Sequence, residues 1–382
     1  MTESVAIIGV GCRPFGRYVD TGVRAEAVAA AQLALRDAGL RWPDIGFAVG
    51  GSMSGGAADT LVAELGLTGV PFVNVLNGCA TGSSSLTVAV QAIASGAAEF
   101  ALVLGFDSHP RGAFAIKPEA LGLGGWYGPT GLALTSQFFA LKLQRYLHEH
   151  DLPERLLAKV AAKAFRNGSL NPNAWRRKPL SEQEINASAM VSDPLRQYMF
   201  CSPGDGAAAL VLCSARRARE LSPHPVFVAG NVVRTRRPGS FEVLSPSLSI
   251  HTGVSPTVDA AAAVFEAAGI APSEVDLAQL QDTDSGAELI HLAETGLCAH
   301  GEQTELIERG ETELTGRLPI NTDGGCLANG EPIGASGLRQ IHENVLQLRG
   351  TAGDRQAPGR PRVALSHVYG APGLSGATVL VR

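Results

Sequence analysis

The feature that most constrains this chain is an internal duplication. The segment 30–51, AAQLALRDAGLRWPDIGFAVGG, aligns without a gap on the segment 261–282, AAAVFEAAGIAPSEVDLAQLQD, and places Gly39 on Gly269. Each copy has the pattern of an alanine-rich helix, a glycine stop, a short acidic turn and an apolar strand. Self-similarity at this scale indicates that the chain folds as two related units.

A second match in the same order supports the duplication. NGCATGSSSLTVAVQAIASG (77–96) aligns with NGEPIGASGLRQIHENVLQLRG (329–350), with a two-residue gap near the end. The apolar strand that follows at 100–107 then meets another at 363–370. Each half therefore alternates strands with helices, which predicts an α/β fold with largely buried sheets.

The duplication also predicts the domain organisation. We expect an N-terminal half at residues 1–222 and a C-terminal half at residues 223–382, joined through the basic, proline-containing stretch SARRARELSPHP (214–225). The segment 108–200 has no counterpart in the second half and contains aromatic residues, predicted helices and a basic loop. It is expected to be an insertion that covers one face of the fold.

Composition narrows the class of protein. Hydrophobic residues make up 45% of the 382 residues and charged residues 18%, so the chain can bury a large core. A net charge of −5 with no long basic run argues against nucleic acid as the main partner. We expect no membrane span and no charged leader. The six cysteines are scattered without a CxxC pair, which argues against a structural zinc site and a disulfide scaffold. This usage predicts that the protein resides in the reducing cytoplasm.

Cys79 is the candidate nucleophile. It stands where the extended apolar run FVNVL gives way to a stretch with helical spacing. Free backbone N–H groups and the positive end of the helix dipole favour a thiolate at a helix N-terminus, and glycines on both sides leave room for a substrate. A cysteine is also often a small buried core residue, so its position alone leaves both roles open.

Taken together, these motifs resemble the thiolase superfamily. The resemblance is carried by NGCATGSSSL (77–86), CSPGDGAAALVL (201–212), LPINTDGGCLANGEPIGASG (318–337) and the glycine-rich last strand. It covers essentially the whole chain and is most similar to the sterol-carrier-protein-X and lipid-transfer-protein branch. The resemblance implies a layered α-β-α-β-α core of duplicated βαβαβ halves, related by a pseudo-twofold axis, and acylation of Cys79 by an acyl-CoA.

The residues implied beside the nucleophile depart from the family pattern. Thiolases carry a Gly-His-Pro turn where this chain has Glu331, and the pseudo-twofold axis would place Glu331 near Cys79. A carboxylate can accept a proton but repels a developing thiolate, and near a buried thiol its pKa should be raised. The family's His-Asp-Cys-Phe motif is replaced by QDTD at 281–284.

The last strand is the second departure. Degradative thiolases carry a second cysteine there, and this chain has Tyr369 at that place, followed by Gly370. His367 precedes Tyr369 by two residues, so both side chains should share one face of the strand. Tyr369 could donate a proton to an enolate and His367 could move protons near neutral pH. The alternative for His367 is a core residue.

The substrate side of the site follows from the same resemblance. Thiolases bind coenzyme A as part of the substrate, so we expect no resident cofactor and no metal. Arg176, Arg177 and Lys178 form a basic loop that could hold the CoA phosphates or be only a solvated surface loop. Trp126, next to Tyr127, is expected to line or cover an apolar acyl pocket.

The sequence thus predicts a thiolase-like acyl-CoA enzyme, an acyltransferase that makes or breaks a C–C bond through Cys79 with a non-standard acid/base set. One alternative is a retro-aldolase acting on a steroid-type or other hydroxyacyl-CoA, since lipid-transfer-protein aldolases also lack the thiolase acid/base residues. Another is a non-catalytic acyl-CoA-binding or scaffold subunit. The resemblance further implies a homodimer and allows a small OB-fold partner with a zinc ribbon.

Overall fold

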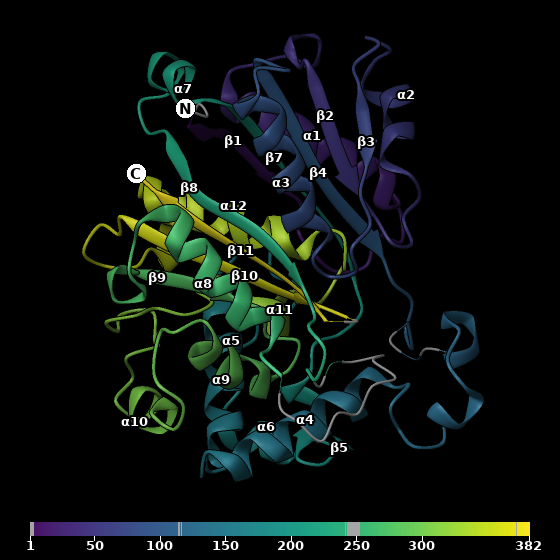
Figure 1. Cartoon of the computed structure of the whole chain (residues 1–382), viewed down its shortest axis with the longest axis vertical. Coiled ribbons are helices and arrows are strands. Elements are labelled where there is room, and N and C mark those ends of the chain that lie inside the picture. The colour runs from purple at the N-terminus through teal and green to yellow at the C-terminus, as the bar shows by residue number, and fades with distance from the viewer. Residues whose placement is uncertain (1–3, 114, 116, 241, 243–252, 372) are drawn as a thin grey trace.

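The computed structural model describes residues 4–113, 115, 117–240, 242, 253–371 and 373–382. In this part of the chain, nine strands form one mixed sheet in the order β3-β2-β4-β7-β1-β8-β11-β10-β9 (Figure 1). The strands of this sheet are β1 (Val5–Cys12), β2 (Phe47–Gly51), β3 (Phe72–Asn74), β4 (Phe100–Ser108), β7 (Asp205–Ser214), β8 (Val226–Thr235), β9 (Leu277–Leu280), β10 (Val363–Gly370) and β11 (Leu374–Val381).

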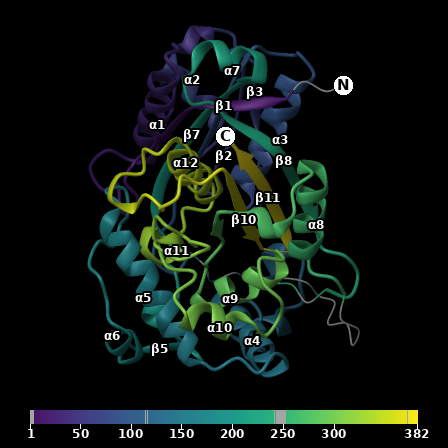
Figure 2. The same ribbon diagram turned by 90° about the vertical axis from the view of Figure 1, so that its left-hand side faces the viewer.

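Four helices complete the layers. They are α1 (Val23–Ala38), α3 (Thr81–Ala94), α8 (Pro256–Ala268) and α12 (Ser336–Arg349). Helix α1 packs on β1, β4 and β7, and α8 packs on β8 and β11, whereas α3 and α12 contact each other and strands of both half-sheets. In Figure 2, α1 and α8 lie on opposite sides of the molecule with α12 between them. The predicted layered α-β-α-β-α class is therefore confirmed.

The duplicated elements have the same local geometry. Helix α1 ends at Gly39 with a φ of 68°, and α8 ends at Gly269 with a φ of 65°, so the aligned glycines both adopt the left-handed conformation. The two half-sheets are joined where β1 pairs antiparallel with β8, from Val5 to Ile7 on β1. This pairing makes one continuous sheet from two related halves.

The remaining elements lie mostly in the insertion and in the C-terminal half. They are α2 (Val62–Leu65), α4 (Thr135–Glu149), α5 (Arg155–Leu170), α6 (Glu182–Asn186), β5 (Met190–Ser192), β6 (Leu195–Arg196), α7 (Ala215–Leu221), α9 (Ser285–Glu294), α10 (Gln303–Glu308) and α11 (Gly325–Asn329). Helix α5 packs against α9, α10 and α11. The inserted helices therefore rest on the C-terminal half, at the lower end of Figure 1.

Glycines bring the two active turns together at the centre. A Cβ atom on Gly82, in the first turn of α3, would lie 2.9 Å from the backbone nitrogen of Leu338 in α12. A Cβ atom on Gly105 in β4 would lie 2.2 Å from the carbonyl oxygen of Gly334. Both distances are shorter than any ordinary carbon contact, so the halves approach this closely only because side chains are missing there.

Replacing Gly105 should therefore destabilise the protein. The Gly105→Ala variant must displace the backbone at Gly334, and overpacking of this kind costs about 1–3 kcal/mol. Gly46→Ala is a matched control, because its Cβ would meet Ala98 at an ordinary 3.5 Å. Thermal unfolding of both variants should show a lower midpoint for Gly105→Ala alone. Equal unfolding midpoints for the two variants would contradict the close approach of Gly105 to Gly334.

Candidate functional site

Cys79 lies in a tight turn directly before α3. It is half-buried, and Ala80 is the N-cap of the helix. The hydroxyl of Thr81 donates to the carbonyl of Gly78 at 2.7 Å and accepts from the backbone N–H of Asn77 at 2.9 Å, which closes the turn around the cysteine. The strand-to-helix geometry expected from the sequence is thus present, and it fixes Cys79 at a helix N-terminus.

The end of β10 lies against this turn. A Cβ atom on Gly370 would be 3.1 Å from the backbone nitrogen of Cys79 and 3.0 Å from that of Ala80. A side chain at Gly370 would therefore push the last strand away from the nucleophile. Backbone groups of Ala371 and of Cys79 itself act to lower the pKa of the Cys79 thiol. The end of β10 therefore contributes to the electrostatics of the nucleophile.

Glu331 faces Cys79 from the other half of the chain. Its side chain is 1% exposed, and the amide of Gln281 donates to both carboxylate oxygens at 3.0 Å. The carboxylate is also close enough to the thiols of Cys79 and Cys326 for its charge to raise the pKa of both. The alignment of the two active turns therefore corresponds to a direct contact across the centre of the molecule.

Burial and charge determine the protonation of this pair. Burial raises the pKa of the Cys79 thiol well above its ordinary value, and the nearby Glu331 charge raises it further. Burial also raises the pKa of Glu331, as expected from the sequence. The positive end of the helix dipole favours a thiolate, but burial and the carboxylate act against it and raise the pKa of the thiol. Cys79 therefore needs a base when it reacts.

Two further cysteines border the same carboxylate. After burial, Glu331 is the largest contribution that raises the pKa of both Cys201 and Cys326. The sulfur of Cys326 also accepts from the guanidinium of Arg339 at 3.7 Å. Sequence reasoning treated the cysteines as scattered and missed this convergence, although Cys326 lies within the motif that carries the family resemblance.

The QDTD segment at 281–284 has a clear structural role in place of the family's motif. Gln281 orients Glu331, as described above. The carboxylate of Asp282 accepts from the backbone N–H of Cys326 at 2.6 Å, at the start of α11. Asp284 accepts from the N–H of Ala287 at 2.9 Å and caps α9. This segment therefore fixes the Glu331 side chain and the starts of α11 and α9, which border the site.

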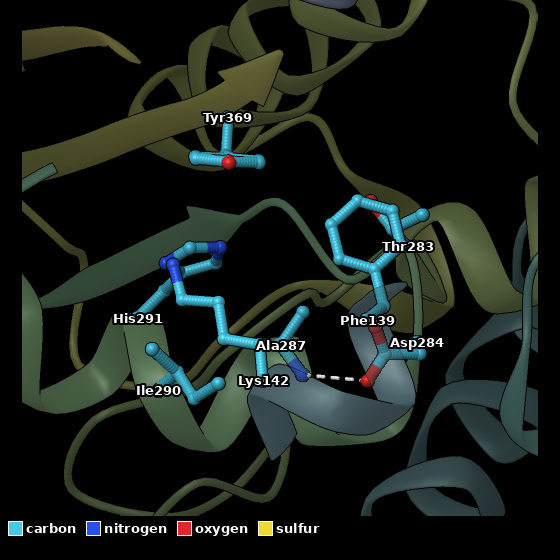
Figure 3. Close-up of a pocket in the computed structure, with 8 residues that line it drawn as sticks. All are labelled: Phe139, Lys142, Thr283, Asp284, Ala287, Ile290, His291 and Tyr369. Carbon is cyan, nitrogen blue, oxygen red and sulfur yellow. Dashed lines mark hydrogen bonds between the residues drawn. The ribbon is translucent and has the colours of Figure 1, made fainter. Parts of the chain in front are cut away.

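Tyr369 lines a small pocket beside this arrangement (Figure 3). The empty space among its side chains is about 310 Å³, part of which is open to solvent. Its lining residues are Phe139, Lys142, Thr283, Asp284, Ala287, Ile290, His291 and Tyr369. The Tyr369 hydroxyl donates to the carboxylate of Glu242, and the Lys142 ammonium lies 5.1 Å from the centre of the Tyr369 ring. The phenol is thus placed among ionisable side chains, which the sequence did not indicate.

His367 does not reach this pocket. Its ring lies 4.5 Å from that of His291, which also contacts Tyr369, so His367 and Tyr369 share one face of β10 as expected. However, His367 is fully buried, and its Nε2 bonds the hydroxyls of Ser375 and Thr257 at 3.0 and 3.1 Å. Burial holds its pKa well below the usual range. This environment fits the core alternative for His367.

The predicted basic loop divides into two parts. The guanidinium of Arg176 donates to the carbonyl of Leu327 at 3.1 Å and to the hydroxyl of Ser202, so it ties α11 to the insertion. Arg177 and Lys178 are exposed. The expectation that all three bind phosphate therefore does not fit the contacts of Arg176.

Trp126 lies outside the pocket of Figure 3. Its side chain is 59% exposed and packs edge-on against Tyr127, with ring centres 5.5 Å apart. Tyr127 is buried in a separate apolar cluster with Phe138. A role for Trp126 in covering an acyl group would require a surface other than this pocket.

Comparison with known proteins agrees with the fold. The family model of the thiolase C-terminal domain matches residues 246–382. Sterol carrier protein 2 of Gallus gallus is 34% identical, over 100% of this chain and 71% of that protein. Acetyl-CoA acetyltransferase of Methanothermobacter thermautotrophicus is 32% identical, over 97% of each chain. The solved structure of the Ltp2-ChsH2(DUF35) aldolase has a TM-score of 0.85 and 26% identity, over 99% of this chain and 97% of that one.

The fold and the paired active turns define a thiolase-type enzyme. The chain belongs to the thiolase superfamily, in the branch that includes sterol carrier protein 2, and is a thiolase-like acyl-CoA enzyme. No helix in the described residues has the length and apolarity needed to cross a membrane. No group of three or more His, Cys, Asp or Glu side chains in the same residues could hold a metal ion.

The pKa of Cys79 should fall when the Glu331 charge is removed. Because that charge raises the thiol pKa, Glu331→Gln should shift the pH profile of iodoacetamide labelling at Cys79 to lower pH. Peptide mass spectrometry can follow each cysteine separately. Cys298 is an internal reference, since burial and Glu302 raise its pKa to about 12 without Glu331. An unchanged Cys79 profile would contradict the electrostatic coupling.

Proposed function

We propose that this enzyme accepts an acyl group from an acyl-CoA on Cys79, with Glu331 as the base, during the making or breaking of a C–C bond. The observation that carries the proposal is the position of the buried Glu331 carboxylate beside the Cys79 thiol, where its charge raises the pKa of the thiol. A thiol with a raised pKa is a weak nucleophile until a positioned base removes its proton. Glu331 is the group in contact with that proton.

The acylation step follows from this contact. Glu331 takes the proton as the Cys79 sulfur attacks the thioester carbonyl, and it returns the proton to the departing CoA sulfur. The backbone N–H groups of Cys79 and Ala371, which act to lower the pKa of the thiol, are proposed to bind the oxygen on which charge develops. Gln281 donates to both oxygens of Glu331 and keeps the carboxylate oriented.

The C–C bond step is proposed to use Tyr369. Tyr369 lines the pocket of Figure 3, and the next residue, Gly370, lies against the backbone of the Cys79 turn. Coenzyme A enters as part of the substrate, with no resident cofactor. Arg177 and Lys178 are exposed and available for its phosphates, although Lys178 also lies 3.9 Å from Glu184.

A retro-aldolase is the second candidate. Two observations favour it: a tyrosine rather than a thiol lines the pocket, and the chain is similar over 99% of its length to the Ltp2-ChsH2(DUF35) aldolase. A retro-aldol cleavage of a β-hydroxyacyl-CoA needs a base for the hydroxyl and an acid for the enolate. It does not need acylation of Cys79, which separates the two candidates experimentally.

Assembly and location are also proposals. β3 is an edge strand of the sheet, and Val73 on it and Leu76 after it are exposed, so a second copy of the chain could pair there as a homodimer. The similarity to the Ltp2-ChsH2(DUF35) aldolase supports a partner protein of the DUF35 type, in the role expected of the small OB-fold protein. The six free cysteines are consistent with the proposed cytoplasmic location.

Acylation should be visible by intact-mass measurement. Incubation with a panel of acyl-CoAs should add the mass of one acyl group to the wild-type enzyme. Cys79→Ala should remove the adduct, whereas Cys298→Ala, which changes another half-buried cysteine, should keep it. An adduct on Cys79→Ala would contradict the assignment. No wild-type adduct with any member of the panel would contradict acylation and leave the retro-aldolase or the scaffold role.

A further inference from the structure

A buried carboxylate that the proposed acylation does not use lies behind Tyr369. Glu242 is 2% exposed and accepts the hydrogen bond of the Tyr369 hydroxyl through Oε2. The Lys142 ammonium lies 3.8 Å from the same oxygen and also faces the Tyr369 ring. Three elements far apart in sequence therefore meet at one phenol: α4, the segment after β8, and β10.

The charges around Glu242 come from every element packed against it. Burial raises the pKa of Glu242, while Lys142 and Arg236 lower it and Glu294 raises it. Burial acts to lower the pKa of Lys142, but Glu294, Glu242 and Asp284 together raise it, so Lys142 stays charged. The pKa of Glu294 is lowered to about 2, mainly by Lys142 against its burial. The pKa of Glu242 is thus raised by its burial and held back by two nearby cations.

We infer that Glu242 is the proton store of the C–C bond step, acting through the Tyr369 hydroxyl, and that Lys142 holds this pair in position. The inference rests on the proposed role of Tyr369. Glu242 and Lys142 do not touch the reacting carbon in this arrangement, so they are positioning residues for the tyrosine. The chemistry they serve is proton transfer at the α-carbon of an acyl thioester.

The transfer balances without any further reactant. As an α C–H bond of the thioester breaks, its electron pair enters the enolate and its proton moves to the Tyr369 oxygen. The original hydroxyl proton of Tyr369 passes at the same time to the ionised Glu242. The reverse transfer protonates the enolate, so the tyrosine stays neutral in both states.

Glu242 and Tyr369 can serve either candidate reaction, because both reactions pass through the enolate of a thioester. In a retro-aldol cleavage, the proton of the β-hydroxyl reaches Glu242 through Tyr369 as the C–C bond breaks. It then returns by the same path to the α-carbon. No second acid is needed, which fits a site that lacks the family's usual histidine and second cysteine.

The position of the pair relative to Cys79 suits this role. Gly370, which directly follows Tyr369, contacts the Cys79 turn. On the opposite wall, Thr283 lines the pocket and its carbonyl accepts from the backbone N–H of Cys201, whose pKa responds to both Glu331 and Cys79. A thioester held at Cys79 can therefore extend its α-carbon toward Tyr369.

The test is exchange of the methyl hydrogens of acetyl-CoA with deuterium in D₂O, measured by mass spectrometry. The wild-type enzyme should catalyse exchange. Tyr369→Phe and Glu242→Gln should slow it by about 10²- to 10⁴-fold, the usual range for a positioned proton carrier. Glu182→Gln is a matched control, since it removes a carboxylate 3.7 Å from Lys159 on the surface, and should exchange like the wild type.

The pH profile separates this role from a structural one. Exchange needs ionised Glu242, so the wild-type rate should rise with pH through a pKa above that of an ordinary glutamate. Glu242→Gln should lose this rise, and Glu242→Asp should recover part of the rate. Lys142→Gln should move the rise to higher pH, because Lys142 lowers the pKa of Glu242.

The outcomes distinguish this inference from the proposed acylation. Acylation of Cys79, followed by intact mass in the same samples, should persist in Glu242→Gln, which also shows that the variant is folded. Wild-type exchange that is absent, or that survives unchanged in Glu242→Gln, would overturn the inference. Absence of a Cys79 adduct in the wild type would instead contradict the proposed function. The inference about Glu242 would still stand if exchange is observed and depends on Glu242.

Discussion

The contact between Glu331 and the Cys79 thiol is the interaction on which the site depends. A carboxylate removed from water is costly unless its oxygens are hydrogen-bonded. Gln281 donates to both oxygens, and the carboxylate raises the pKa of the Cys79 thiol beside it. The site is therefore a thiol–carboxylate pair with coupled protonation, rather than a preformed thiolate beside a cation.

This pair exists because the fold brings two equivalent turns into contact. Helices α3 and α12 form the central layer, and Gly82 lets α3 approach the backbone of α12. Gly105 leaves the room that the turn after Glu331 occupies. The insertion then covers the site, with Arg176 tied to α11 and α4 supplying Lys142. Duplication thus builds the nucleophile side, and the insertion adds Lys142 to the second group of ionisable side chains, whose other members, Glu242 and Tyr369, come from the C-terminal half.

The sequence predicted the parts of the structure that the duplication encodes. The helix stops at Gly39 and Gly269 and the α/β alternation follow from aligning the two halves, whereas the layered arrangement and the meeting of Cys79 with Glu331 were implied by the thiolase resemblance. The protonation of Cys79 could not be predicted from its place before a helix, because it depends on burial and on a charge from the other half. Glu242 could not be found either, since it has no aligned partner and meets Tyr369 only through the tertiary fold.

The most direct test of the account is the pH dependence of a single turnover of Cys79 acylation, measured by release of the free CoA thiol. In the wild type, the rate should rise through one pKa above that of an ordinary glutamate. Glu331→Gln should abolish this rise, and Glu331→His, which restores the histidine of other thiolases, should move it into the imidazole range. Acylation by Glu331→Gln at the wild-type rate with the same pH profile would contradict the central claim.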